Sequence, residues 1–149
     1  MAKGLLIDST RCIGCRACQV ACKEWNGLEA EDTEFFEGSP YQNPKDLSEN
    51  TYLVMQYYEI ENPDNGELSW VFSRRSCMHC IDPACVSACI VGALTKSEDG
   101  PVVYDASKCI GCRYCMMACP WEIPKYQWFN SSPQVRKCVL CRDRIARGL

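Results

Sequence analysis

Residues 108–120 read Lys-Cys-Ile-Gly-Cys-Arg-Tyr-Cys-Met-Met-Ala-Cys-Pro, so four cysteines stand close together and directly before a proline. Residues 11–23 read Arg-Cys-Ile-Gly-Cys-Arg-Ala-Cys-Gln-Val-Ala-Cys-Lys, which is identical at eight of the thirteen positions. A segment that recurs so closely predicts two copies of one structural unit. The chain has 149 residues and 14 cysteines, a density typical of a fold that sulfur chemistry holds together alongside a small apolar core.

A third run of four cysteines lies between these two segments, and a shorter pair follows them. The runs are Cys12-x2-Cys15-x2-Cys18-x3-Cys22, Cys77-x2-Cys80-x4-Cys85-x3-Cys89 and Cys109-x2-Cys112-x2-Cys115-x3-Cys119, and the pair is Cys138-x2-Cys141. The run before Pro120 has the bacterial ferredoxin pattern, in which three thiolates hold one iron–sulfur cluster and the fourth ligates its neighbour. Lys23 and Ile90 replace the proline after the other two runs, and neither change removes a ligand.

Crossed ligation of this kind predicts which cysteines share a cluster. Cluster A takes Cys77, Cys80, Cys85 and Cys119, and cluster B takes Cys109, Cys112, Cys115 and Cys89. The outer clusters are C, with Cys12, Cys15 and Cys18, and D, with Cys22, Cys138 and Cys141. Each outer cluster lacks one cysteine, because a 4Fe–4S cluster takes four. We therefore expect four 4Fe–4S clusters, or three if the last pair is not a cluster site.

Two other uses of the cysteines compete with iron. Disulfides require a secreted context, and nothing in the sequence supports one. Zinc sites use paired C-x2-C segments, and Cys138 with Cys141 has the form of half of such a site. Runs of four cysteines within eleven to thirteen residues do not suit separate tetrahedral zinc sites. A zinc-stabilised interaction module without a redox role is the corresponding alternative for the whole chain.

Composition and charge argue against several classes of protein. The net charge of −3 argues against a nucleic-acid binder, and the single histidine, His79, excludes a site built from several histidines. The sequence shows no catalytic constellation, so we do not expect the chain to be an enzyme by itself. No apolar run approaches the length of a membrane span, and the first residues do not read as a secretory signal. We expect a cytoplasmic protein, with export on a signal-bearing partner left open.

The pattern predicts an α+β fold of tandem, pseudo-symmetric bacterial ferredoxin-like modules with an inserted β-hairpin and long loops. The predicted domains are an outer cluster module (1–22 with 120–149), an insertion with the hairpin (23–76) and a two-cluster ferredoxin module (77–119). β-Branched and aromatic residues predict the hairpin strands at 51–61 and 68–73, joined by a turn at 63–66. We also expect a strand at 5–8, a helix at 83–89, and strands at 92–96 and 101–105.

Three segments together carry a wider resemblance. They are residues 11–23, Cys77-Met78-His79-Cys80 with Asp82-Pro83-Ala84-Cys85, and residues 109–124. In these segments the chain resembles the four-cluster iron–sulfur subunits of molybdenum and tungsten oxidoreductases. That family includes formate dehydrogenase beta subunits and electron-transfer subunits of the dimethyl-sulfoxide-reductase type. Similar modules serve some hydrogenases and tungsten aldehyde oxidoreductases.

The resemblance implies an electron-transfer subunit that relays single electrons through its 4Fe–4S clusters. The expected partner is a Mo/W-pterin catalytic subunit of the formate dehydrogenase or tungsten aldehyde oxidoreductase type, and a further redox subunit is a second expected partner. The chemistry on the substrate then belongs to the cofactor of the catalytic partner. The alternative is a free polyferredoxin that carries electrons between several enzymes, which the acidic balance of the chain also suits.

The resemblance also raises a question about the last cysteines. In the family a C-x3-C pair follows the last C-x2-C pair, whereas this sequence runs only from Cys141 to Leu149 after it. Either the chain is cut before its last two ligands, or the subunit binds three clusters and uses Cys138 and Cys141 for something else. We expect the first of these.

Overall fold

A computed structural model describes residues 2–34 and 41–148 of the chain. Residues 35–40 of the predicted insertion, and Leu149 at the end of the predicted outer module, lie outside the described residues. The chain divides into two compact units, one formed by Leu6–Arg75 and the other by Met1–Leu5 with Ser76–Leu149. Both units combine short helices with pairs of strands, so the fold is α+β.

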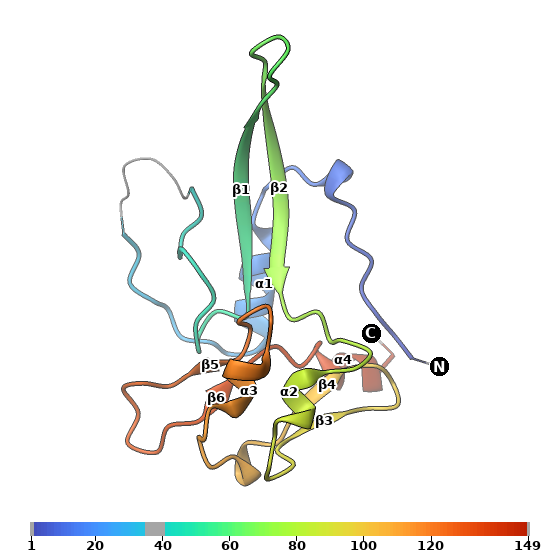
Figure 1. Cartoon of the computed structure of the whole chain (residues 1–149), viewed down its shortest axis with the longest axis vertical. Coiled ribbons are helices and arrows are strands. Elements are labelled where there is room, and N and C mark those ends of the chain that lie inside the picture. Colours follow the sequence, from blue (N-terminus) through green and yellow to red (C-terminus); the bar gives the residue numbers. More distant parts are fainter. Residues whose placement is uncertain (1, 35–40, 149) are drawn as a thin grey trace. The chain divides into compact units, whose positions relative to one another are not determined.

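The unit Leu6–Arg75 is built around one helix and a long strand pair (Figure 1). Its elements are η1 (Ser9–Arg11), α1 (Ala17–Trp25), β1 (Leu53–Glu61) and β2 (Leu68–Ser76), and β1 pairs with β2. The inner end of β1 is buried at Leu53, Val54 and Met55, and α1 packs against this strand. The outer end of β1 is exposed, because its turn projects beyond the helix that covers the inner end.

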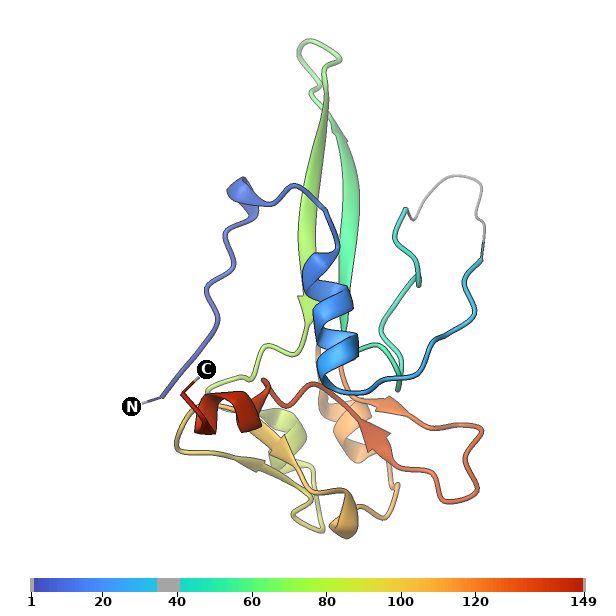
Figure 2. The ribbon, with the colours of Figure 1, turned by 180° about the vertical axis from the view of Figure 1, so that it is seen from behind.

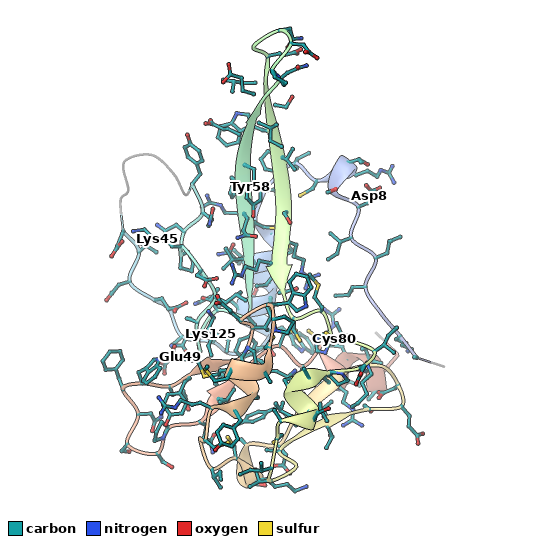
Figure 3. All side chains as sticks on the ribbon, in the orientation of Figure 1. Asp8, Lys45, Glu49, Tyr58, Cys80 and Lys125 are labelled. Carbon is teal, nitrogen blue, oxygen red and sulfur yellow. The ribbon has the colours of Figure 1, made fainter. Side chains whose placement is uncertain are left out.

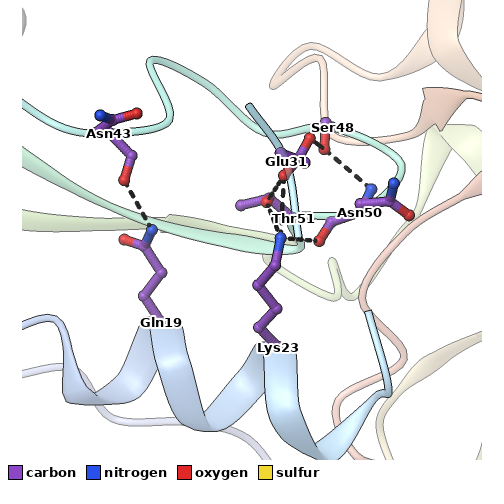
Figure 4. Close-up of polar contacts among 7 residues, drawn as sticks. All are labelled: Gln19, Lys23, Glu31, Asn43, Ser48, Asn50 and Thr51. Atoms are coloured by element: carbon purple, nitrogen blue, oxygen red, sulfur yellow. Dashed lines mark hydrogen bonds and ion pairs between the residues drawn. The ribbon is translucent and has the colours of Figure 1, made fainter. Parts of the chain in front are cut away.

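A polar network fixes the C-terminal half of α1 to the loop that precedes β1 (Figure 4). The Lys23 ammonium lies 3.2 Å from the Glu31 carboxylate and donates to the Asn50 carbonyl at 2.9 Å. The hydroxyls of Ser48 and Thr51 also donate to Glu31. Burial alone would raise the pKa of Glu31, but these hydrogen bonds and the Lys23 charge outweigh burial and lower it. The network therefore stabilises the ionised carboxylate.

The unit that contains residues 76–149 holds the other short elements, of which β5 and β6 are best followed from behind (Figure 2). They are α2 (Ala84–Ser87), β3 (Leu94–Lys96), β4 (Val102–Tyr104), η2 (Ala106–Lys108), α3 (Tyr114–Ala118), β5 (Lys125–Tyr126), β6 (Val135–Arg136) and α4 (Arg142–Ala146). β3 and β4 are antiparallel, and so are β5 and β6. Among the described residues, one core cluster is formed by Leu94, Val102, Cys115 and Val135, so a cysteine takes part in it.

The predicted elements of this unit are present but shorter than expected. The helix predicted at 83–89 is the single turn α2, and the strands predicted at 92–96 and 101–105 are β3 and β4. The strand predicted at 5–8 is wrong, because among the described residues nothing pairs with this segment as a strand requires. The pair β5–β6 was not predicted. No helix within residues 2–34 and 41–148 is long and apolar enough to cross a membrane.

The two repeated cysteine loops adopt the same local backbone conformation. Gly14 and Gly111 have φ of 67° and 69°, and Arg16 and Arg113 have φ of 61° and 65°. Both glycines also face close neighbours: a Cβ on Gly14 would lie 2.9 Å from a ring carbon of Phe72, and one on Gly111 would lie 2.8 Å from the Pro133 carbonyl oxygen. Glycine is thus required in these loops by conformation and by space together.

We expect Gly111→Ala to destabilise the protein more than Gly92→Ala. Gly92 has φ of 63° and open space around its Cβ position, so its substitution isolates the conformational cost of about 1 kcal/mol. Gly111→Ala adds a clash with backbone and should cost about 1–3 kcal/mol more. Urea unfolding of the two variants under anaerobic conditions measures the difference. Equal losses of stability would show that the close packing over Gly111 is not needed.

We expect Glu31→Gln to weaken the loop before β1 by about 1–2 kcal/mol at neutral pH, because it removes the charge that Lys23, Ser48 and Thr51 surround. Hydrogen exchange of the Ser48 and Thr51 amides, which bond across this loop at 3.1 and 3.3 Å, reports the local opening. The folded-state pKa of Glu31 lies below its ordinary value of 4.5, so this stabilisation is complete at neutral pH and is lost as pH falls through the folded-state pKa.

The matched control for that experiment is Glu34→Gln. Glu34 forms an ion pair with Lys45 at 3.0 Å, but both side chains are more than half exposed. Such a pair contributes little, so amide exchange in the control should stay close to that of the unaltered protein. Equal effects of the two substitutions would contradict a specific role for the network of Figure 4.

Candidate functional site

None of the fourteen cysteines forms a disulfide bond, and their burial differs between the runs. Cys115 and Cys138 are buried, Cys15 and Cys18 are exposed, and the others are intermediate. Cys80, labelled in Figure 3, lies in the loop that leads into α2. The cysteines nearest the core of the unit 76–149 are thus better shielded from water than those of the first run.

One pocket brings together four cysteines from two different runs. Cys109, Cys112 and Cys115 line it from the loop and first turn of α3, and Cys89 lines it from the segment that follows α2. The pocket contains about 310 Å³ of empty space, part of it open to solvent. α2 and α3 pack against each other, which explains how a cysteine of one run reaches the loop of the other. Four cysteines around one pocket form the ligand set that a 4Fe–4S cluster takes.

Electrostatic coupling connects Cys115 with thiols of both runs. Burial raises the pKa of the Cys115 thiol to about 11, and the thiols of Cys89, Cys112, Cys85 and Cys109 add to this rise in that order. The thiol is therefore neutral near pH 7 in the iron-free protein, and metal binding must release its proton. The same four cysteines were predicted for cluster B, and their ligation of iron stays a prediction.

A second group of thiols surrounds Cys85. Burial raises the pKa of Cys85, and the Lys137 ammonium opposes this rise. Three further thiols raise it: Cys77, Cys119 and Cys80. These are the four cysteines predicted for cluster A, with Cys119 again coming from the other run.

Cys138 lies next to this second group. Burial raises the pKa of its thiol, and the thiols of Cys77 and Cys141 add to the rise. Leu140 and Cys141 have φ of 59° and 46°, and this left-handed turn leads directly into α4. The last C-x2-C pair therefore shares its surroundings with a member of the second run.

Several N–H groups donate hydrogen bonds to cysteine sulfurs. The Leu94 amide donates to Cys89 at 3.4 Å and the Leu140 amide donates to Cys138 at 3.3 Å. In the first run the side-chain amide of Asn26 lies 3.8 Å from the Cys22 sulfur. Donors placed in this way stabilise sulfur as a thiolate and tune the potential of a bound cluster.

Tyr104 adds a hydroxyl to the pocket of Cys109. Its oxygen is buried and has no nitrogen or oxygen partner among the residues that the structure describes, and it faces the Cys109 sulfur. Burial alone would raise the pKa of Cys109, but hydrogen bonds from Tyr104 and from the backbone of Val135 and Gly111 outweigh it and lower the pKa. Sequence reasoning missed Tyr104, although its place at the end of a strand that leads into the cysteine loop was a usable signal.

An arginine and an aromatic ring cover each repeated loop. The Arg16 guanidinium lies 4.8 Å from the Tyr57 ring centre and donates to its hydroxyl at 2.8 Å, and this hydroxyl donates to the Gly14 carbonyl. In the other unit the Arg113 guanidinium lies 5.4 Å from the ring centre of Tyr126 and 5.2 Å from that of Trp128. The arginine recurs at the same place in both repeats, which is the signal that sequence reasoning passed over.

His79 has a structural contact rather than a catalytic partner. It is buried, and its Nδ1 accepts a hydrogen bond from the Val102 amide at 3.0 Å. Among the described residues no three cysteine, histidine or acidic side chains converge as the ligands of one metal ion do. In a cubane cluster, by contrast, each cysteine binds a separate iron.

Comparison with known proteins gives matches over nearly the whole chain. Two family models described as 4Fe–4S dicluster domains match residues 11–93 and 68–149. The chain is 44% identical over 144 residues to the formate dehydrogenase-O iron-sulfur subunit of Escherichia coli, which is 96% of this chain and 46% of that protein. It is 41% identical over 144 residues to the formate dehydrogenase iron-sulfur subunit of Haemophilus influenzae, which is 96% of this chain and 45% of that protein.

A third relative comes from a different kind of enzyme system. The hydrogenase-2 operon protein HybA of Escherichia coli O157:H7 is 39% identical over 150 residues, which is 95% of this chain and 43% of that protein. The chain spans less than half the length of these curated relatives. Two dicluster domains imply up to four 4Fe–4S clusters. Because each of the two matching models covers more than half of the sequence, this chain belongs to the 4Fe–4S dicluster domain family.

Proposed function

We propose that the chain is the electron-transfer part of an oxidoreductase and that it passes single electrons between 4Fe–4S clusters. The observation that carries this proposal is the pocket in which Cys89 meets Cys109, Cys112 and Cys115. The cysteines around Cys85 give a second group of the same composition. Neither group contains a residue arranged to act on a substrate, so the substrate chemistry belongs to another subunit.

The protein contributes to this function by holding the clusters in position and by adjusting their reduction potentials. A bound cluster supplies the one-electron redox chemistry. The contact between α2 and α3 holds the two cysteine groups near each other, and proximity is what electron tunnelling requires. The amide and hydroxyl donors to sulfur adjust how readily each cluster accepts an electron.

We further infer that the fold contains tandem, pseudo-symmetric modules. Support comes from the repeated loops, since Asp8 and Asp105 cap equivalent turns with side-chain bonds of 3.0 Å to Thr10 and Ser107. The shared φ values of the loops and the arginine covers add to this support. The domain limits at 1–22, 23–76, 77–119 and 120–149 and the outer clusters C and D stay predictions.

The names of the relatives guide the choice of partner. Relatives are iron-sulfur subunits of formate dehydrogenases, and another belongs to a hydrogenase operon. We propose a catalytic subunit with a molybdenum- or tungsten-pterin cofactor as the partner of this chain and a cytoplasmic location for the pair. A tungsten aldehyde oxidoreductase partner is a narrower form of the same proposal, and the names of these relatives do not include it.

Double substitutions test the crossed ligand sets. Cys89→Ala and Cys112→Ala each remove a ligand of cluster B, so the double variant should alter no more clusters than either single variant. Cys89→Ala combined with Cys80→Ala should alter two clusters. Iron analysis and electron paramagnetic resonance of the reduced proteins count the intact clusters. If Cys89 instead couples with Cys80, each run binds its own cluster and the crossed assignment is wrong.

The native complex tests the proposed role. We expect the protein purified anaerobically from its own cells to contain iron and sulfide and to elute together with a pterin-bearing subunit. Iron and sulfide with no partner at any stage of purification would favour the free polyferredoxin. Zinc without iron would overturn the electron-transfer function altogether.

A further inference from the structure

A lysine is buried next to Cys138, in the unit that contains the second and third cysteine runs. Lys137 is only 3% exposed, and its ammonium donates to the carbonyls of Val102 at 2.7 Å and Cys138 at 2.6 Å. Among the described residues no carboxylate forms an ion pair with it. Carbonyl dipoles alone compensate a buried charge incompletely, so such a position calls for an anionic neighbour.

The surroundings of the ammonium indicate where that anion lies. Val102, whose carbonyl binds the ammonium, belongs to the core against which Cys85 packs. The other bound carbonyl is that of Cys138, a buried cysteine. Cys89 and Cys109 pack against the same core, and Cys115 belongs to it. Cysteine sulfurs therefore border this interior, and a cluster that they bind is the site at which negative charge can collect.

We propose that Lys137 is the buried counter-charge of an iron–sulfur cluster bound by the cysteines around it, and that it raises the reduction potential of that cluster. This inference rests on the proposed function. Four thiolates give a cluster a net negative charge, and reduction adds one more electron to it. A fixed positive charge in a poorly polarisable interior stabilises the reduced form more than the oxidised form. Lys137 is thus a positioning and tuning residue that binds no iron itself.

The test uses the native complex with Lys137→Met and Lys137→Gln. Both substitutions remove the charge, and glutamine keeps an N–H donor for the Val102 carbonyl. Redox titration followed by electron paramagnetic resonance should show one cluster whose reduction equilibrium constant falls about tenfold in both variants, which for one electron equals about 59 mV. Lys137→Arg keeps the charge and should leave that potential close to the original value.

Lys108→Met is the matched control. Lys108 directly precedes Cys109 in the sequence, but its side chain is 59% exposed and pairs with Asp105 at 3.5 Å. Water and salt screen such a charge, so the same substitution should shift the potentials far less. A shift in the control as large as that of Lys137→Met would overturn the proposal, because net charge and not burial would then explain it.

Each of the other possible results also supports or overturns one of the two proposals. Unchanged potentials with all clusters present overturn the role of Lys137 and leave the proposed function standing. If the reduction potential shifts in Lys137→Met but not in Lys137→Gln, the effect comes from the hydrogen bonds. This result also overturns the role of the Lys137 charge. If both uncharged variants lose one cluster while Lys137→Arg retains it, the result supports the need for the charge. If all three variants lose the cluster, the result overturns the role of the charge. Absence of iron–sulfur signals from the unaltered complex would instead contradict the proposed function.

Discussion

The structure depends on the contact that carries one cysteine of each run into the neighbourhood of the other run. α2 and α3 make this contact, and it places Cys89 in the pocket of Cys109, Cys112 and Cys115. Among the described residues, the buried apolar cluster at this contact includes Leu94, Val102, Cys115 and Val135, and further cysteines pack against it. Cysteines are thus part of the packing of this unit, and cluster binding would contribute to its folding energy.

The groups around the thiols also determine how readily negative charge forms on sulfur. Burying a thiol opposes its ionisation, as at Cys115, whereas donors aimed at sulfur favour it, as Tyr104 does at Cys109. Lys137 places a full positive charge in the same interior. The unit therefore surrounds its cysteines with groups that stabilise negative charge on sulfur in a buried environment.

Local sequence patterns were enough to predict the α+β class and the short elements around the second and third runs. These patterns are the cysteine spacing, the repeated Cys-Ile-Gly-Cys-Arg and the β-branched residues of β3 and β4. The segment 5–8 was predicted wrongly, because a strand depends on a partner that local sequence does not reveal. Tyr104 was missed for a similar reason: its importance comes from burial beside a residue of another segment.

The burial of Cys115 also has a consequence for what happens when a cluster is lost. Its side chain lies in the core with Leu94, Val102 and Val135, and it is only 8% exposed. The same residue also lines the pocket of Cys89, Cys109 and Cys112. A cluster bound there would be joined directly to the packing of the core, so that its loss and the loosening of the core would accompany each other.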